Sequence, residues 1–189
     1  RSDSNNGLGI VARHGFSGAV TFQKLDTSES TDLESRYVAH AKVCIDAACA
    51  ATLDVFVTHM MATGSLRNTS MTTQVKQLLS FMAAQAGTRP RVILGDFNLY
   101  EEYEPTCGSS SWPSSILDNL RKAGYKDAWR TLRGTALGYT GMTNRRGCGS
   151  PEGSTYKRID YSWSLDLAPM SVKLFHAPPP RDPAPADHD

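Results

Sequence analysis

Short apolar runs, separated by polar stretches that contain glycine or proline, follow one another along most of this chain. Two of them, Val55-Phe56-Val57 and Val92-Ile93-Leu94, are continuously apolar, which is typical of central strands buried on both faces. Turn-forming residues bound the other strand-like runs. We expect strands over Leu8–Ala12, Ala19–Gln23, Tyr37–Ile45, Ala51–Thr58, Val92–Leu94, Ile159–Trp163 and Val172–Phe175.

One helix is predicted between the two continuously apolar strands. Its apolar residues fall on one helical stripe and are Met71, Val75, Leu78, Leu79 and Met82. A second helix is expected over Ser114–Lys122, because Pro113 suits a position near the first turn and Gly124 follows the end. Strands mixed with a few helices in this order predict a layered α/β or α+β sandwich.

Composition places the chain among ordinary globular domains. It has 189 residues, of which 40% are hydrophobic and 21% charged, and this excludes a mainly disordered or fibrous chain. At roughly 100–200 residues per domain, we expect one domain over residues 1–189. No apolar run approaches the roughly 18 residues of a membrane-spanning helix, so no transmembrane segment is expected. The formal net charge of +1 gives the chain as a whole little attraction for nucleic acid or membrane.

The charges are distributed unevenly along the chain. Nine Lys and Arg residues stand against two acids between Arg121 and Arg158, whereas five acids and no Lys or Arg lie between Asp96 and Asp118. An acidic stretch followed by a basic one suits a site that holds a cation beside a phosphate. Solvated surface charge explains the pattern equally well, and both interpretations stay open at this point.

Four cysteines allow two disulfides. Cys44 and Cys49 flank a short connection between two predicted strands, and Cys107 and Cys148 lie in Gly/Ser-rich segments. Pairing of these two couples indicates an oxidising compartment and hence a secreted or periplasmic protein. The alternative is four reduced thiols in the cytosol.

Polar residues that are unsuited to burial follow several of the predicted strands. His59 follows one, Asp96 and Asn98 follow another, Asp160 lies within a third, and Asp187-His188 come near the end of the chain. Carboxylate and carboxamide oxygens suit Mg²⁺, Mn²⁺ or Ca²⁺ rather than zinc. A histidine that a carboxylate orients can act as a general base on water. These groups could converge at one end of a sheet.

Four short motifs resemble those of the endonuclease/exonuclease/phosphatase superfamily. They are THM at residues 58–60, GDFN at 95–98, RIDY at 158–161 and ADH at 186–188, in the superfamily's order and spacing. The resemblance implies a four-layer α-β-β-α sandwich, in which two mixed sheets pack face to face with helices outside. It also implies a divalent-metal-dependent hydrolase of phosphodiester bonds.

The resemblance assigns roles to five of these residues. His188 matches the histidine that activates the attacking water, and Asp160 matches the carboxylate that orients that histidine. Asp96 and Asn98 match the pair that binds the scissile phosphate and helps to hold the metal. Asp187 matches a carboxylate on the metal side. The implied cofactor is Mg²⁺, with Mn²⁺ or Ca²⁺ as alternatives.

Two further residues are matched to substrate binding. His59 matches a second histidine that contacts the phosphate, and Arg36 resembles a phosphate-contacting arginine of some branches. A surface arginine at the start of a strand is the alternative for Arg36. These two residues and Asn98 are the predicted substrate-binding set.

The sequence also departs from the superfamily pattern. The usual first βαβ portion, with its metal-binding glutamate, is not found before Gly7, and neither Glu29 nor Glu34 matches that glutamate. The strand that follows the ADH motif in the superfamily is not found either. We therefore expect a further N-terminal portion, either covalent or as a nicked partner, of an otherwise monomeric protein.

Several functions are compatible with these motifs. An endonuclease acting on DNA or RNA is favoured, because the basic segment between Arg121 and Arg158 also carries Trp129 and Tyr139 and could follow a nucleic-acid backbone. A sphingomyelinase or phospholipase C-like enzyme, or another phosphatase of the superfamily, is the alternative. A catalytically inactive binding module is a second alternative, which the unmatched glutamate supports.

Overall fold

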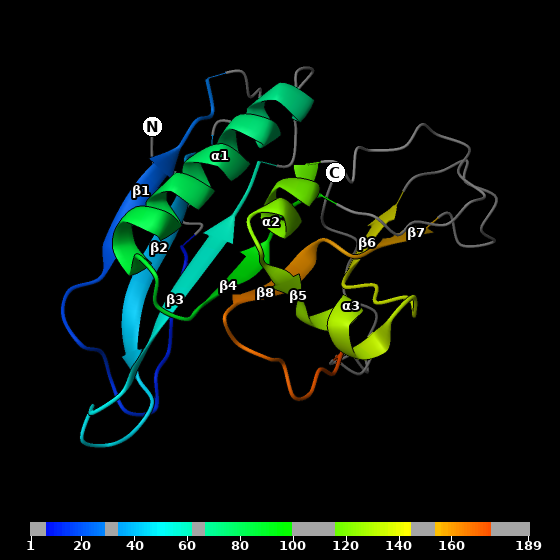
Figure 1. Cartoon of the computed structure of the whole chain (residues 1–189). Coiled ribbons are helices and arrows are strands. Elements are labelled where there is room, and N and C mark those ends of the chain that lie inside the picture. The colour runs from blue at the N-terminus through cyan, green and yellow to red at the C-terminus, as the bar shows by residue number, and fades with distance from the viewer. Residues whose placement is uncertain (1–6, 29–33, 62–66, 100–115, 145–153, 175–189) are drawn as a thin grey trace, which may run out of the picture.

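A six-stranded mixed sheet is the centre of the molecule (Figure 1). The computed structural model describes residues 7–28, 34–61, 67–99, 116–144 and 154–174. The strands follow one another across the sheet in the order β1-β2-β3-β4-β8-β5. Their bounds are Thr21–Leu25 for β1, Arg36–Cys44 for β2, Thr52–His59 for β3, Arg91–Asp96 for β4, Asp160–Leu165 for β8 and Lys126–Asp127 for β5.

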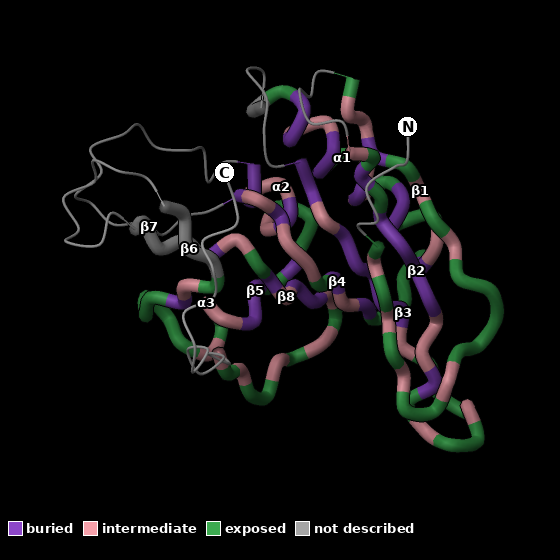
Figure 2. Tube along the Cα trace, turned by 180° about the vertical axis from the view of Figure 1, so that it is seen from behind, coloured by how far each residue is buried: buried purple, intermediate pink, exposed green. Residues whose placement is uncertain are grey.

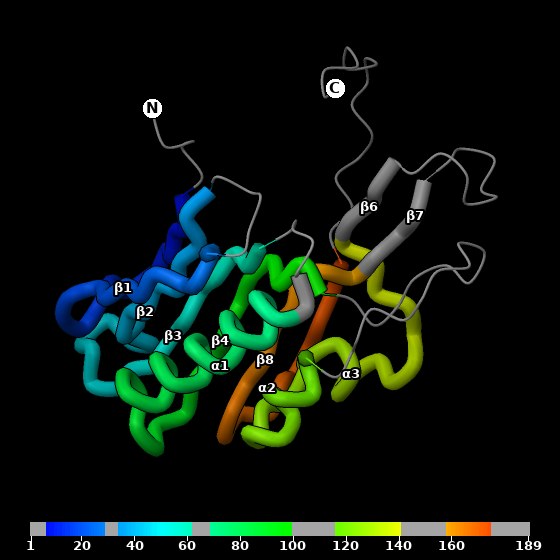
Figure 3. The backbone as a smooth tube through the Cα atoms, turned by 90° about the horizontal axis from the view of Figure 1, so that it is seen from above, coloured from blue at the N-terminus to red at the C-terminus, as the bar shows by residue number. Residues whose placement is uncertain are grey.

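Helix α1 (Arg67–Ala86) connects β3 to β4, which run parallel, whereas every other neighbouring pair in the sheet is antiparallel. A parallel pair needs such a crossover, and a helix supplies it. Figure 3 shows α1 and the short α2 (Asp118–Lys122) on the same side of the sheet. Two shorter strands, β6 (Gly141–Asn144) and β7 (Ser154–Lys157), pair with each other outside the six-stranded sheet.

The main core lies between α1 and the central strands. Leu78 and Met82 of α1 and Phe56, Ile93 and Trp163 of the sheet have no exposed surface. Figure 2 shows buried residues concentrated along these elements. The helix predicted from the Met71-to-Met82 stripe is therefore confirmed, and its apolar side faces the sheet.

Two of the predicted strands are wrong. Leu8–Ala12 is irregular, and Val11 is fully exposed. Residues 172–174 are irregular as well. No neighbouring strand among the described residues pairs with either segment, and strand propensity alone does not supply the hydrogen bonds of a ladder. The second helix is observed only from Asp118, because residues 100–115 are outside the described part of the chain.

The predicted mixed α/β class is confirmed by the six-stranded mixed sheet. The two-sheet, four-layer arrangement stays a prediction, because the described residues contain one large sheet and the β6–β7 ladder. In the same part of the chain no helix is both long and apolar enough to cross a membrane.

A disulfide joins Cys44 at the end of β2 to Cys49 in the connection to β3, with the two Cα atoms 4.7 Å apart. This pairing was predicted and is confirmed. The second predicted pair, Cys107 with Cys148, lies outside the described residues.

Candidate functional site

Three titratable residues form a line across neighbouring strands at one edge of the sheet. His59 ends β3 and is the register partner of Asp96, which ends β4. Asp96 is in turn the register partner of Asp160, the first residue of β8. Partners on adjacent strands have Cβ atoms about 4.5–5.5 Å apart, so these side chains share one small region. The structure thus brings together three of the predicted site residues from segments far apart in the sequence.

Arg36 joins this line from the start of β2. Its Nη1 lies 3.0 Å from Nδ1 of His59, and Nε2 of His59 lies 3.6 Å from Oδ2 of Asp96. A guanidinium can only donate hydrogen bonds, so Nδ1 of the neutral His59 ring is the acceptor and Nε2 carries the hydrogen. Arg36 therefore sets the tautomer that directs an N–H of His59 toward Asp96.

Arg36 is itself held in place. Only 5% of its surface is exposed, and its Nη2 pairs with the Glu34 carboxylate at 2.9 Å. Of the His59 side chain, 37% is exposed, so a ligand can reach the ring. A buried cation behind an accessible imidazole suits an anionic ligand. The alternative of a solvated surface arginine does not describe Arg36.

Gly95 allows β4 to approach β3 closely enough for this geometry. Its φ is +147°, and a Cβ atom placed there would overlap the carbonyl oxygen of Thr58. Only glycine adopts such a conformation without strain. The glycine of the GDFN motif thus has a steric role in placing Asp96 beside His59.

The GDFN segment turns sharply after Asp96. The Asn98 backbone N–H donates to Oδ1 of Asp96 at 2.7 Å, and the Asn98 side-chain amide donates to the carbonyl of Met60 at 2.9 Å. Asn98 has φ of +50°, so the extended backbone of β4 does not continue through it. The side-chain amide instead ties this turn to the end of β3.

The pKa of Asp96 is raised above its usual value of 3.8. Burial of the carboxyl is the largest cause, and the nearby charge of Asp160 adds to it. The backbone hydrogen bond from Asn98 and the charges of His59 and Arg36 act in the opposite direction and do not fully compensate. A further positive charge near Asp96 would lower this pKa and favour the carboxylate form.

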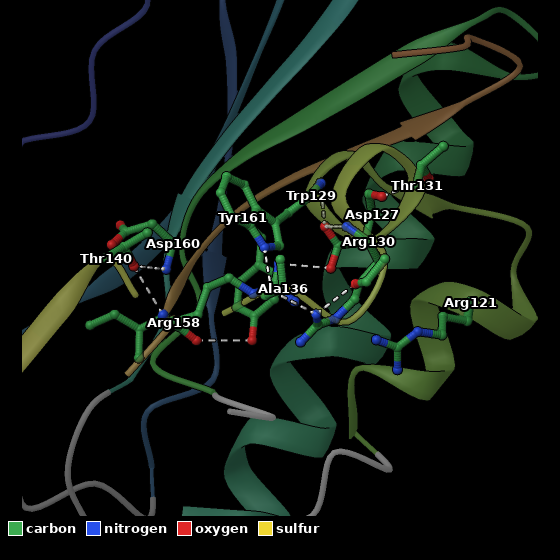
Figure 4. A network of polar contacts seen from close by, with 12 residues as sticks. Arg121, Asp127, Trp129, Arg130, Thr131, Ala136, Thr140, Arg158, Asp160 and Tyr161 are labelled. Atoms are coloured by element: carbon green, nitrogen blue, oxygen red, sulfur yellow. Dashed lines mark hydrogen bonds and ion pairs between the residues drawn. The ribbon is translucent and has the colours of Figure 1, made fainter. Parts of the chain in front are cut away.

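Asp160 is positioned by a network that the sequence did not indicate (Figure 4). Oγ1 of Thr140 accepts hydrogen bonds from the backbone N–H groups of Ile159 and Asp160, at 3.1 and 3.0 Å. The hydroxyl of Tyr161 donates to the carbonyl of Arg158 at 3.0 Å. Together these bonds fix the backbone on both sides of Asp160.

A buried ion pair lies next to this segment. Arg158 Nη1 is 2.8 Å from Oδ2 of Asp127, and both side chains are 2% exposed. The guanidinium also lies over the Tyr161 ring, 4.4 Å from its centre. Oδ1 of Asp127 accepts from the backbone N–H of Trp129 and caps α3 (Ala128–Arg133). An aspartate directly before Ala-Trp-Arg is the helix-start signal that could have identified Asp127.

The arrangement of strands and helices matches solved structures. The described fold is similar to an endonuclease/exonuclease/phosphatase from Beutenbergia cavernae, with a TM-score of 0.62 and 23% identity over 82% of this chain and 39% of that one. The chain has the endonuclease/exonuclease/phosphatase fold. The resemblance predicted from the four motifs is confirmed at the level of the fold.

Other structures with this fold are similar to the chain at lower identity. A mannosyl-6-phosphatase from Bacteroides thetaiotaomicron has a TM-score of 0.51 and 15% identity over 78% of this chain and 52% of its own. TDP2 from D. rerio, in complex with single strand DNA product, has a TM-score of 0.50 and 16% identity over 82% of this chain and 56% of its own. The chain thus spans between 39% and 56% of the length of these three proteins. No protein-family model matches the sequence, and no curated protein matches it either.

Two predicted residues of the site cannot be located in this fold. Asp187 and His188 fall within residues 175–189, outside the described part of the chain. The predicted metal ligand Asp187 and the predicted base His188 therefore stay predictions. The roles of the residues that are described, including Arg36 and Asn98, stay predictions as well.

The described residues do not by themselves make up a metal site. No group of three His, Cys, Asp or Glu side chains among them is arranged to hold a metal ion. The adjacent carboxyl groups of Asp96 and Asp160, with the raised pKa of Asp96, nevertheless fit a divalent cation with oxygen ligands. Asp187, outside the described residues, is the further metal-side carboxylate that the resemblance predicts.

Part of the basic segment is used inside the fold. Arg158 is buried against Asp127, and Arg121 pairs with Asp118 at 2.7 Å. Lys122 and Lys126 are exposed. The charge excess between Arg121 and Arg158 is therefore only partly a surface for a polyanion.

Proposed function

We propose that this chain belongs to a divalent-metal-dependent hydrolase of phosphodiester bonds that acts on nucleic acid. One observation carries the proposal: His59, Asp96 and Asp160 are aligned on three neighbouring strands, and Arg36 fixes the ring of His59. A site with donors on one side and carboxylates on the other suits a phosphate that must be held and attacked. The fold, which it shares with nucleases and phosphatases, supports the same class of reaction.

The proposed roles divide the site in two. Arg36, His59 and Asn98 bind the phosphate oxygens. His188, which Asp160 orients, accepts a proton from the attacking water. Ordered donors that face developing negative charge lower the barrier because they need no reorganisation during the reaction.

Asp96, Asn98 and Asp187 are the residues proposed to hold Mg²⁺, with Mn²⁺ or Ca²⁺ as alternatives. A bound divalent ion supplies positive charge that stabilises the phosphate as its charge develops. Near Asp96, that charge would also offset burial and the repulsion from Asp160.

Nucleic acid is favoured over other phosphodiesters on two grounds. The TDP2 structure in complex with single strand DNA product has the same fold. Lys122 of α2 and Lys126 of β5 are exposed and add positive charge that attracts a polyanion, although the pairing of Lys126 with Ser164 places it away from Asp160. The proposal also includes one domain over residues 1–189 and a four-layer sandwich. It further includes a secreted or periplasmic location, which the Cys44–Cys49 disulfide favours.

Assays with three substrates test the function. Plasmid DNA, sphingomyelin and bis(p-nitrophenyl) phosphate would each be incubated with the chain in Mg²⁺ and in EDTA. We expect hydrolysis of DNA and of the aryl diester in Mg²⁺ alone, and its loss in His59→Ala and Asp96→Ala. Phe16→Ala, on an exposed ring outside the site, is the control. Hydrolysis of sphingomyelin alone indicates the phospholipase alternative. No hydrolysis of any substrate, either by the chain alone or by the chain together with the expected N-terminal portion, indicates the inactive binding module.

A further inference from the structure

A glutamine with no exposed surface lies on the core-facing side of α1. Gln74 is flanked on that side by Met71 and Leu78, one turn before it and one turn after it. Its side-chain Nε2 donates to the backbone carbonyl of Asp26 at 2.8 Å, and its Oε1 accepts from the backbone N–H of Met61 at 3.0 Å. Only this orientation of the carboxamide satisfies both backbone groups, because the reverse would oppose donor to donor and acceptor to acceptor. Gln74 therefore connects two segments that are far apart in the sequence.

The two segments that Gln74 joins follow the strands on either side of β2. Asp26 comes directly after β1, whose last residue is the register partner of Arg36. Met61 comes after β3 and is two residues from His59. Because β2 lies between β1 and β3 in the sheet, Gln74 spans the end of the strand that carries Arg36. The glutamine thereby fixes the spacing across the part of the sheet edge where Arg36 meets His59.

The residue between His59 and Met61 is held as well. The backbone N–H of Met60 donates to the carbonyl of Asp96 at 2.8 Å, and the carbonyl of Met60 accepts from the Asn98 side chain at 2.9 Å. Met60 and Met61 have no exposed surface, so water does not replace a bond that is lost there. The chain that leaves β3 is thus attached to β4 through Met60 and to α1 through Met61.

We propose that Gln74 is a positioning residue for the proposed hydrolysis, because it holds the end of β3 where Arg36 can bond the His59 ring. This inference rests on the proposed function and deepens it. Nη1 of Arg36 lies 3.0 Å from Nδ1 of His59, and a separation beyond about 3.5 Å is no longer a hydrogen bond. A small shift of the segment after His59 is therefore enough to break this contact. Without it, both neutral tautomers of the ring become accessible, and Nε2 carries the hydrogen for only part of the time.

Nitrogen NMR of the whole 189-residue chain tests this positioning. At about pH 8.5, where an ordinary histidine is neutral, the ring signals of His59 report which nitrogen carries the hydrogen, and their absence in His59→Ala assigns them. We expect an unprotonated Nδ1 in the wild-type chain. In Gln74→Met, which has a similar length but can make neither bond, the Nδ1 signal should move toward that of a protonated nitrogen. The kcat/KM for bis(p-nitrophenyl) phosphate should fall about 10- to 100-fold, as misplacement of a reacting group by about 1 Å can cause.

Gln77→Met is the matched control. Gln77 lies about one turn further along α1, and its Oε1 accepts from the backbone N–H of the same Asp26 at 2.8 Å. In the described part of the chain, no hydrogen bond of Gln77 reaches the segment after β3. This control loses a glutamine bond to the same backbone residue, yet it should leave the His59 signals and kcat/KM unchanged. Urea unfolding of both variants separates a loss of stability from the change at His59.

Two results with folded variants would overturn the role of Gln74. One is an unchanged set of His59 signals in Gln74→Met, and the other is an equal change in Gln77→Met. If the wild-type chain hydrolyses no phosphodiester, even together with the expected N-terminal portion, the proposed function fails. The nitrogen signals still decide in that case whether Gln74 positions His59.

Hydrogen exchange of the wild-type chain decides the question if Gln74→Met does not fold. The Met61 amide, bonded to Gln74, should exchange as slowly as the Met60 amide, which is bonded to Asp96. A Met61 amide that exchanges much faster than that of Met60 would overturn the proposal, because the glutamine would then not hold the segment after β3.

Discussion

Asp96 and Asp160 stand directly opposite each other, as register partners on the antiparallel strands β4 and β8. Like charges in this position destabilise a sheet. The pKa of Asp96 is raised, first by burial and then by Asp160, so its ionised form costs folding free energy. The carboxylates of Asp96 and Asp160 therefore repel each other, and a bound cation or a proton would remove this repulsion.

We predict that Asp96→Asn raises the free energy of unfolding at pH 7 by up to about 1 kcal/mol without added metal. A carboxyl whose pKa is higher in the folded than in the unfolded chain stabilises the protein at low pH and loses this contribution as the pH rises through the folded pKa. The advantage of the asparagine variant should therefore shrink as the pH falls toward 4. Urea unfolding between about pH 4 and pH 7 measures it.

Asp160→Asn provides the matched comparison for this pair. Each single change removes the same repulsion. The free energy of unfolding should therefore rise less in the double variant than the sum of its rises in the two single variants. Strictly additive gains would contradict the coupling between Asp96 and Asp160. Added Mg²⁺ should stabilise the wild-type chain more than either variant, which thermal unfolding would reveal.

A second buried carboxylate lies elsewhere on the sheet and has the opposite pH dependence. Asp54, 1% exposed, contacts Nε2 of His40 at 2.6 Å and accepts from Nε of Arg89 at 2.6 Å. Burial by itself raises its pKa, but the hydrogen bonds from Arg89 and His40 outweigh burial and lower it below 3.8. This contribution to stability is present above the unfolded pKa and is lost as the pH falls through the folded one.

Asp54→Asn should therefore lower the free energy of unfolding at pH 7 by roughly 1–3 kcal/mol, because the asparagine loses the charge-assisted bonds whereas Arg89, 45% exposed, can still be hydrated. The difference from the wild-type chain should diminish below about pH 4. Urea unfolding at several pH values measures both effects. Asp166→Asn, at an exposed carboxylate after β8, should change little. A loss at Asp54 that does not vary with pH would show that its charge is not what stabilises the fold.

Sequence patterns predicted the elements whose composition reflects how they are buried. The apolar stripe of α1 packs against the sheet, and the continuously apolar runs of β3 and β4 lie at the centre of that sheet. The same reasoning failed for Leu8–Ala12, an apolar segment with which no strand in the described part of the chain pairs. Pairing partners that are distant in sequence decide whether such a segment becomes a strand.

The residue types of the candidate site were predictable from the sequence, whereas the contacts that position them were less so. His59, Asp96 and Asp160 stand out because each is polar at the end of an apolar run. Thr140 does not stand out, since its effect on Asp160 passes through backbone N–H groups. Asp127 can be identified as a helix start, but its ion pair with Arg158 cannot be read from the sequence. Contacts of this kind depend on tertiary structure and leave no periodic pattern.

Thr140→Val should reduce kcat/KM for the proposed hydrolysis of bis(p-nitrophenyl) phosphate by about tenfold. This change is equivalent to about 1.4 kcal/mol. The valine has a similar shape but cannot accept the hydrogen bonds from Ile159 and Asp160. Thr140→Ser keeps the hydroxyl and should retain the activity. A serine variant as impaired as the valine variant would mean that the methyl group, and not the hydrogen bonds, is what matters.

The disulfide closes a short loop, and chain-entropy reasoning assigns it a modest effect. Replacing both Cys44 and Cys49 by alanine should lower the free energy of unfolding by about 2 kcal/mol. Urea unfolding of this variant against the wild-type chain measures the change. Peptide mapping of the unreduced protein should show the Cys44–Cys49 link, and it also tests the predicted pairing of Cys107 with Cys148. Free thiols at all four positions would contradict the proposed location.

Gly95→Ala should be the most damaging single-methyl change among the described glycines of the strands. The new Cβ would overlap the Thr58 carbonyl, and the φ of +147° is unfavourable for any L side chain. Because backbone atoms oppose it, β4 would have to move away from β3 and separate His59 from Asp96. We expect a loss of more than about 3 kcal/mol in unfolding free energy, or failure to fold, as backbone strain and overpacking combine.

Gly9→Ala, with no atom within 4 Å of the added methyl group, should leave stability unchanged. Circular dichroism and urea unfolding of the two variants compare them directly, and equal stability would mean that β3 and β4 are not packed as closely as Gly95 requires.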